Sequence, residues 1–149
     1  MPIPETLAQR IVAEAESYVG TPFLHQGRLK GLGIDCAHFV ANVINVARED
    51  AQPIDIPHNY KPREDGTIMM ALLGENAEFV LTEDRQPGDV IALCDEALRH
   101  PDIPRHLVFI KDVTPKTTFI IHASERGVRA HRMDSAWMRR IHSCWRATE

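Results

Sequence analysis

The chain has 149 residues, 44% of them hydrophobic and 26% charged, which suits one globular domain over residues 1–149 with a core of its own. Its net charge is −4 and only 6% of its residues are aromatic, so we expect no broad basic and aromatic surface and no nucleic-acid partner. A mildly acidic domain of this kind must owe its function to a local site.

The cysteines and the N-terminus indicate the compartment. Three cysteines, at positions 36, 94 and 144, are an odd number at long spacings, which fits neither a disulfide framework nor a zinc site of the C-x-x-C type. The first 19 residues carry neither the basic region nor the apolar run of a signal peptide, and no run of about 18 apolar residues marks a membrane span. We expect reduced thiols, no metal site, and synthesis in the cytoplasm.

Helices are predicted in the first part of the chain. Residues 5–18 place their apolar side chains on one stripe, which predicts an amphipathic helix that ends at Gly20. Residues 20–34 hold several glycines and are predicted to form an irregular loop. A second helix is predicted from Cys36 onward because its apolar residues recur at helical spacing, with Asp35 as the natural N-cap.

Strands are predicted in the second part. The proline-rich residues 52–62 predict a loop, and a short helix follows over about 66–73. Helices first and strands afterwards define an α+β domain. A turn or short helix around Trp137 leads into the last of the predicted antiparallel strands, which are 86–93, 105–113, 116–123, 127–133 and 140–147.

Cys36 is the first candidate for chemistry. A thiol in the first turn of a helix faces unpaired N–H groups and the positive end of the helix dipole, so we expect a lowered pKa and a nucleophilic thiolate. The alternative is that Cys36 is simply a small apolar residue of the buried stripe.

A nucleophilic thiol needs a base, and histidine is the usual one. Among eight histidines, His106 opens the apolar run HLVFI and His122 closes the run FIIHA, so both lie at strand ends and could project to one edge of a sheet. One imidazole would take the thiol proton and a second polar group would set its tautomer. Alone, each could equally be a structural histidine. Solvated or packing roles are expected for His58, His100, His131 and His142, for which the sequence identifies no partner.

Four segments resemble the NlpC-type cell-wall cysteine peptidases. GTPFLHQGRLKGLGIDCAHFV is similar to their nucleophile motif, a G-x-x-Y/F loop and a glycine pair before D-C at a helix start. QPGDVIAL, RHLVFI and TTFIIHAS follow in the family's order, and the resemblance covers about residues 10 to 147. It implies a papain-like α+β fold, with N-terminal helices packed on a C-terminal antiparallel sheet.

The first segment and the ending GVRAHRMDSAWMRRIHSCWR resemble most the subgroup found in tail-gene clusters of bacteriophages and gene-transfer agents. Members of that subgroup lack signal peptides because the particle carries them. The resemblance therefore implies a component made in the cytoplasm and built into a phage-like tail, with tail proteins as partners and a substrate outside the cell.

The resemblance also implies roles for single residues. Cys36 would attack an amide carbonyl of a peptidoglycan stem peptide, at a bond between D-glutamate and a diamino acid. His106 would act as general base and then acid, and His122 would orient His106. No metal or organic cofactor is required. The implied substrate-binding residues are Phe23, His25, Asp35 and Ala37.

Departures from the family leave two alternatives open. Phe23 stands where the family often has tyrosine, Ala37 follows the cysteine where many members have serine, and Leu107-Val108-Phe109 replaces Val-Gly-Ile. The chain could therefore be a catalytically weak structural or assembly component of a tail, or a Cys-His amidase or acyltransferase acting on another acyl substrate. The arginines of the C-terminal stretch could bind stem-peptide carboxylates or form a solvated strand face.

Overall fold

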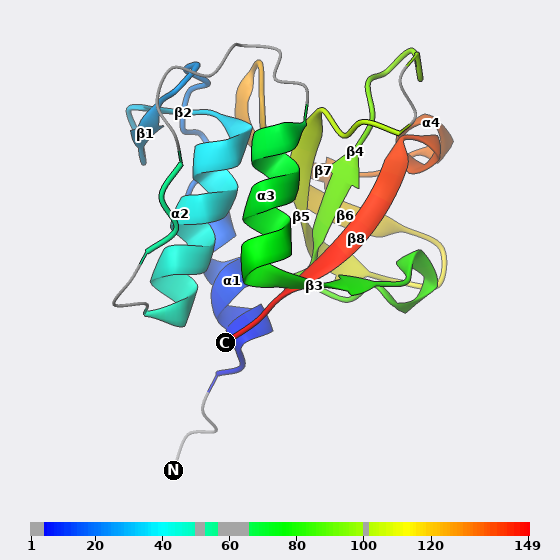
Figure 1. Cartoon of the computed structure of the whole chain (residues 1–149), viewed down its shortest axis with the longest axis horizontal. Coiled ribbons are helices and arrows are strands. Elements are labelled where there is room, and N and C mark those ends of the chain that lie inside the picture. The colour runs from blue at the N-terminus through cyan, green and yellow to red at the C-terminus, as the bar shows by residue number, and fades with distance from the viewer. Residues whose placement is uncertain (1–4, 50–52, 57–65, 100–101) are drawn as a thin grey trace.

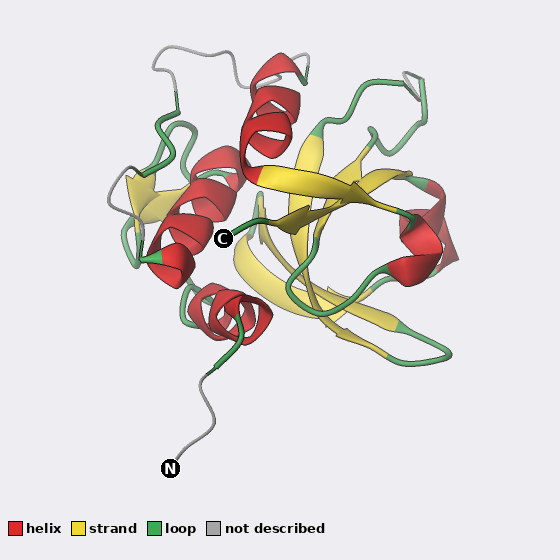
Figure 2. Ribbon diagram, turned by 60° about the horizontal axis from the view of Figure 1, so that its bottom comes forward, coloured by secondary structure: helices red, strands yellow, loops and turns green. Residues whose placement is uncertain are grey.

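The computed structural model describes residues 5–49, 53–56, 66–99 and 102–149. Three helices, α1 (Leu7–Glu16), α2 (Cys36–Arg48) and α3 (Thr67–Asn76), lie beside a curved sheet, and the short α4 (Ser135–Arg139) lies at its far side (Figures 1 and 2). The predicted order of helices followed by strands is confirmed, and the architecture is α+β.

The main sheet is antiparallel throughout, in the order β3-β8-β4-β5-β6-β7. Its central strand β4 has the sequence VIAL and is buried along its whole length, because side chains pack against it on both faces. The strands are β3 (Ala77–Val80), β4 (Val90–Leu93), β5 (His106–Val113), β6 (Thr118–Ser124), β7 (Gly127–Arg132) and β8 (Ile141–Ala147).

Local capping sets where the first helix begins. The Thr6 hydroxyl accepts the N–H of Gln9 at 3.1 Å, and the Gln9 side chain accepts the N–H of Thr6 at 2.9 Å. This reciprocal pair satisfies two donors that the first turn leaves open, so α1 starts at Leu7 rather than at residue 5. The helix ends at Glu16, four residues before Gly20.

Three sequence predictions need correction. Residues 20–34 are not wholly irregular, because β1 (Arg28–Leu29) pairs with β2 (Gly33–Ile34), strands too short to show a period. Only 90–93 of the predicted strand 86–93 is extended, and a turn occupies the rest. Strand β3 was not predicted, because it follows α3 directly without a turn signal. Most of the predicted 52–62 loop lies outside the described residues.

The sheet carries a core on each face. The larger core lies under α1, α2 and α3, where the Phe39 ring meets the rings of Tyr18 and Phe109 edge to face at 5.3 and 5.5 Å. The smaller core lies on the opposite face and is covered by α4. Side chains alternate along a strand, so His106 points to the same face as Val108 and Ile110 of the smaller core.

No helix among the described residues combines the length and the apolar run that crossing a membrane requires.

Candidate active site

The start of α2 is held by Asp35, as predicted. One carboxylate oxygen of Asp35 accepts the backbone N–H of His38 at 2.9 Å and bonds the ring Nδ1 of His38 at 2.9 Å. The other oxygen accepts the backbone N–H of Gln26 at 2.9 Å, which binds the preceding loop to the helix. Asp35 is buried, and these bonds place Cys36 as the first residue of α2.

The loop before Cys36 is also joined to the turn between β6 and β7. The backbone N–H of Gly20 donates to the Val128 carbonyl at 3.0 Å, and the N–H of Val128 donates to the Thr21 carbonyl at 2.8 Å. Gly127 has φ +99°, and a Cβ there would lie 2.8 Å from the Thr21 oxygen, so this position requires glycine. The contact brings the strand that carries His122 close to the start of α2.

Three histidines form a hydrogen-bonded chain beside the thiol. The Nε2 of His106 lies 2.7 Å from the Nδ1 of His122, and the Nε2 of His122 lies 2.8 Å from the Nε2 of His131. The remaining nitrogen of His131, Nδ1, lies 2.8 Å from the Arg132 carbonyl oxygen. The Trp137 ring packs edge to face against the rings of His122 and His131, at 5.2 and 5.0 Å.

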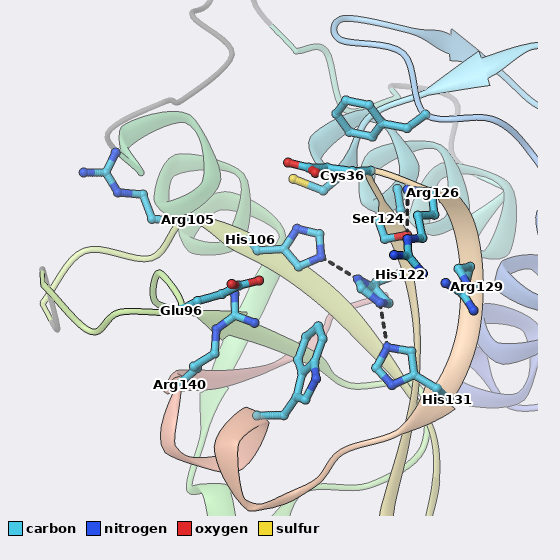
Figure 3. A pocket seen from close by; sticks show the side chains of 14 residues that line it. Cys36, Glu96, Arg105, His106, His122, Ser124, Arg126, Arg129, His131 and Arg140 are labelled. Atoms are coloured by element: carbon cyan, nitrogen blue, oxygen red, sulfur yellow. Dashed lines mark hydrogen bonds between the residues drawn. The ribbon is translucent and has the colours of Figure 1, made fainter.

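Cys36 and the histidine chain line one pocket of about 530 Å³ (Figure 3). The Cys36 side chain comes from the start of α2, and the free edge of the His106 ring faces it, on the side opposite the bond to His122 (Figure 3). Charged side chains surround the pair. The charged residues that line the pocket are Arg105, Arg126, Arg129, Arg140, Glu96 and Glu125.

Burial is the largest influence on the pKa values of Cys36 and His106. Burial, together with the negative charge of Asp35, raises the pKa of Cys36 to about 12, although the backbone amides of Leu107, Cys36 and Ala37 act to lower it. The predicted lowering by the helix N-terminus is therefore wrong, because these amides and the helix dipole offset only part of the cost of an ion out of water.

The pKa values of His106 and His122 are shifted in the opposite direction, downward. Burial lowers the pKa of His106 to about 3, assisted by the charges of His122 and Arg140. Burial likewise lowers the pKa of His122 to about 4, assisted by the charges of His131 and Arg140. At neutral pH, Cys36 is therefore a neutral thiol, and His106 and His122 are neutral imidazoles.

The structure places the predicted site residues in two groups. Cys36, His106 and His122 come together, and Phe23 lines the same pocket. His25, Asp35 and Ala37 do not line it. The carboxylate of Asp35 is already engaged in capping α2, and Ala37 is buried in the larger core.

Sequence reasoning missed His131 and Trp137. A packing or solvated role was expected for His131, yet it bonds His122. The signal was present, because the short turn between β6 and β7 pairs His122 with Arg129, and His131 lies two residues further along the same face. The three arginines of the C-terminal stretch that reach the pocket are Arg126, Arg129 and Arg140.

The other two cysteines lie apart from the pocket. Cys94 is 2% exposed and Cys144 is fully buried, and all three cysteines are free thiols. Within the described residues, no three His, Cys, Asp or Glu side chains converge as the ligands of a metal ion would.

No protein-family profile and no curated protein sequence matches the chain. Solved structures do match its fold, and the likeness defines the fold class as the papain-like NlpC/p60 type. A lipoprotein-like protein of the NLP/P60 family from Staphylococcus aureus subsp. aureus Mu50 aligns with 100% of the chain, with a TM-score of 0.68 and 16% identity.

Two further structures are similar. The NlpC/p60 domain of the peptidoglycan hydrolase SagA aligns with 95% of the chain, with a TM-score of 0.60 and 18% identity, and Ly7917 aligns with 95% at 0.61 and 10%. The chain spans 44% of the staphylococcal chain, 98% of the SagA domain and 63% of Ly7917. At these identities the likeness concerns the fold.

Proposed function

We propose that this protein is a cysteine hydrolase that cleaves an amide bond in the stem peptides of peptidoglycan. The observation that carries the proposal is the placement of Cys36 at the start of a helix, facing a histidine that a second histidine orients. The similar fold of the peptidoglycan hydrolase SagA and the four sequence motifs support the choice of substrate.

The first half of the reaction forms a thioester. The Cys36 sulfur attacks the amide carbonyl carbon while its proton passes to Nδ1 of His106. The backbone amides of Cys36 and Ala37, which lie beside the sulfur, can donate to the oxyanion, at about 3 kcal/mol for each well-placed donor. The C–N bond then breaks, and the leaving amine takes the proton from His106.

Water completes the cycle. It attacks the thioester carbonyl carbon and gives a proton to His106, after which the C–S bond breaks and the sulfur recovers that proton. The product is a free carboxylic acid. A neutral starting pair suits this sequence because the proton moves only when the substrate is attacked, and no buried ion pair has to be maintained in the empty site.

The charges of the pocket favour an anionic substrate. Its lining arginines outnumber its glutamates, and Arg140 is held in place by donating to the Cys94 carbonyl at 3.0 Å and by packing on the Trp137 ring at 4.7 Å. Arginine binds carboxylates strongly, and stem peptides carry several. This lining disfavours the alternative of an apolar acyl substrate.

Two finer proposals rest on the sequence motifs. The bond cut is the one between D-glutamate and the diamino acid, and the protein acts as part of a phage-like tail. Mass spectrometry of fragments released from defined muropeptides tests the bond. Co-purification of the chain with tail particles tests the association, and its absence from intact particles would contradict it.

Substitution of the nucleophile tests the hydrolase itself. Cys36→Ala should abolish release of peptides from purified cell wall, by at least about a thousandfold, because the covalent step is lost. Cys94→Ser and Cys144→Ser serve as matched controls and should retain activity, since neither thiol lines the pocket. Equal loss in all three variants, or no hydrolysis by the unaltered protein, would reject the proposal in favour of a structural tail component.

Arg129 tests the substrate class. Arg129 lies on β7 opposite His122 and is exposed at the pocket wall. Arg129→Gln should raise KM for a stem peptide with free carboxylates by about 5- to 10-fold, leave kcat nearly unchanged, and have little effect on an amidated peptide. Arg139→Gln, which removes an exposed arginine outside the pocket lining, is the control. An equal effect of both variants would argue against a carboxylate contact.

A further inference from the structure

The hydrogen bonds between the three histidines all donate in one direction, and the carbonyl oxygen at the end of the chain determines that direction. A carbonyl oxygen can only accept, so the bond between His131 Nδ1 and the Arg132 carbonyl requires the proton of His131 to be on Nδ1. When its ring is neutral, His131 carries one N–H, and Nε2 of His131 is then an acceptor. The Nε2 of His122, 2.8 Å away, must therefore donate to it.

This direction extends through His122 to the catalytic base. Because His122 carries its proton on Nε2, its Nδ1 is an acceptor, and the Nε2 of His106 at 2.7 Å must donate to it. The Nδ1 of His106 is thereby left with a lone pair, on the edge of the ring that faces Cys36 (Figure 3). Only this tautomer of His106 can take the thiol proton.

The opposite direction would disable the base. If position 131 offered a donor to His122, or nothing, His122 would be free to carry its proton on Nδ1 and donate to Nε2 of His106. His106 would then present an N–H to Cys36 and could not accept its proton. In serine proteases, a third residue that holds the catalytic histidine in the wrong tautomer lowers kcat by about 10⁴-fold.

The surroundings hold His131 in this arrangement. His131 lies on β7 opposite Ile120 of β6, two residues along the strand from the position opposite His122. The Trp137 ring packs against both His122 and His131, and Arg140 in turn lies over the Trp137 ring at 4.7 Å. The bond between His122 and His131 is therefore covered by α4 on one side and supported by the sheet on the other.

We propose that His131 is a positioning residue that fixes the tautomer of His106 through His122, with the Arg132 carbonyl as the terminal acceptor of the chain. Its effect on catalysis rests on the proposed function, whereas the tautomers are a property of the free protein and can be measured without substrate.

Substitutions at position 131 show whether the hydrogen-bond acceptor or only the volume of the side chain matters. His131→Leu removes the acceptor, and kcat should fall roughly a hundredfold with little change in KM, because the binding surface is retained. His131→Gln offers an amide oxygen to His122 and should keep kcat within about fivefold of the unaltered protein. His142→Leu removes another partly buried histidine, bonded to Ser143 outside the pocket, and should leave kcat unchanged.

Nitrogen-15 NMR of the histidine rings provides a readout that a purely structural role would not move. In the free protein His106 and His122 should each carry the proton on Nε2, and His131 on Nδ1. In His131→Leu the shifts of His106 should report partial or full transfer of the proton to Nδ1, and in His131→Gln they should match the unaltered protein.

The outcomes separate this inference from the proposed function. A proton on Nδ1 of His106 in the unaltered protein would overturn it, as would unchanged His106 tautomers in His131→Leu, or a loss in His131→Gln equal to that in His131→Leu. If the protein hydrolyses no cell wall, the NMR comparison and the rate of Cys36 alkylation by iodoacetamide in the same variants still decide the inference. If His131→Leu fails to fold, the tautomers of the unaltered protein and of His131→Gln decide it.

Discussion

At the scale of single residues, Cys36 shows two opposing influences on one thiol. The start of α2 favours the thiolate, while burial and the Asp35 carboxylate favour the thiol, and the balance raises the pKa of Cys36 to about 12. Burial also disfavours the charged form of His106 and lowers its pKa to about 3. We therefore expect the reactivity of Cys36 to depend on a proton acceptor nearby rather than on a stable thiolate.

Alkylation of the thiols tests this dependence on a nearby base. Iodoacetamide near pH 7.5 should modify Cys36 in the native protein, with Cys94 and Cys144 protected by burial. His106→Gln should slow the modification of Cys36 by at least about tenfold, because the neutral thiol loses its base. Mass spectrometry of the labelled peptides gives the three rates. Modification of Cys36 that is as fast without His106, and already complete below pH 6, would show a stable thiolate instead.

At the scale of elements, the site is assembled where a loop, a helix and a hairpin meet. Asp35 binds the loop to α2, and Gly127 lets the β6–β7 turn approach the same loop closely enough for two backbone hydrogen bonds. Neither contact involves the side chain of Cys36, His106 or His122. Both determine the distance between Cys36 on the helix and the histidines on the sheet.

Two glycines with opposite environments test this contact. Gly127→Ala should destabilise the protein by about 2 kcal/mol or more, because the new Cβ meets the Thr21 oxygen at 2.8 Å in a left-handed backbone conformation. Gly74→Ala, in the last turn of α3 with open space around it, should stabilise the protein by up to about 1 kcal/mol. Urea unfolding of both variants measures the difference. A similar free energy of unfolding for the two would mean that the turn and the loop are not in close contact.

At the scale of the whole molecule, one sheet serves two cores and carries the site at one end. The helices cover the larger core and α4 covers the smaller one, and the histidine chain runs along the face of the smaller core towards the start of α2 (Figures 1 and 3). Because His106 and His122 are buried in uncharged form, their protonation is coupled to the stability of the fold.

The lowered pKa values of His106 and His122 determine whether stability rises or falls with pH, and over which pH range. In the unfolded chain histidine titrates near its ordinary pKa of about 6.5, whereas folding lowers the pKa of His106 to about 3 and that of His122 to about 4. Below pH 6.5 the unfolded state therefore binds more protons, and stability falls as the pH falls towards 4, by about 1.4 kcal/mol per pH unit for each histidine. Above pH 7 the contribution of these two histidines to the free energy of unfolding no longer changes with pH.

Urea unfolding at pH 7, 6 and 5 measures this slope, and His106→Gln provides the comparison. Between pH 6 and 5, the slope of the free energy of unfolding against pH should be smaller in the variant by about 1.4 kcal/mol per pH unit. The reason is that one buried neutral histidine no longer gains a proton on unfolding. An unchanged slope would show that His106 is charged or solvent-accessible in the folded protein.

The sequence by itself determined the features that depend on neighbours along the chain. Helical spacing located α2, and runs of β-branched and aromatic residues between turn signals located most of the strands. Asp35 could be recognised as the cap of α2 because a cap acts within three residues of its own position. The position of Cys36 at a helix start followed directly. The α+β fold class is confirmed for the same reason, since it depends on the order of the elements.

Only the tertiary structure decided the features that depend on distant residues. Four arginines from different segments of the chain line one pocket together with Cys36. The pKa of Cys36 moved against the expectation because removal from water depends on every element packed around a group, and no local pattern records that burial.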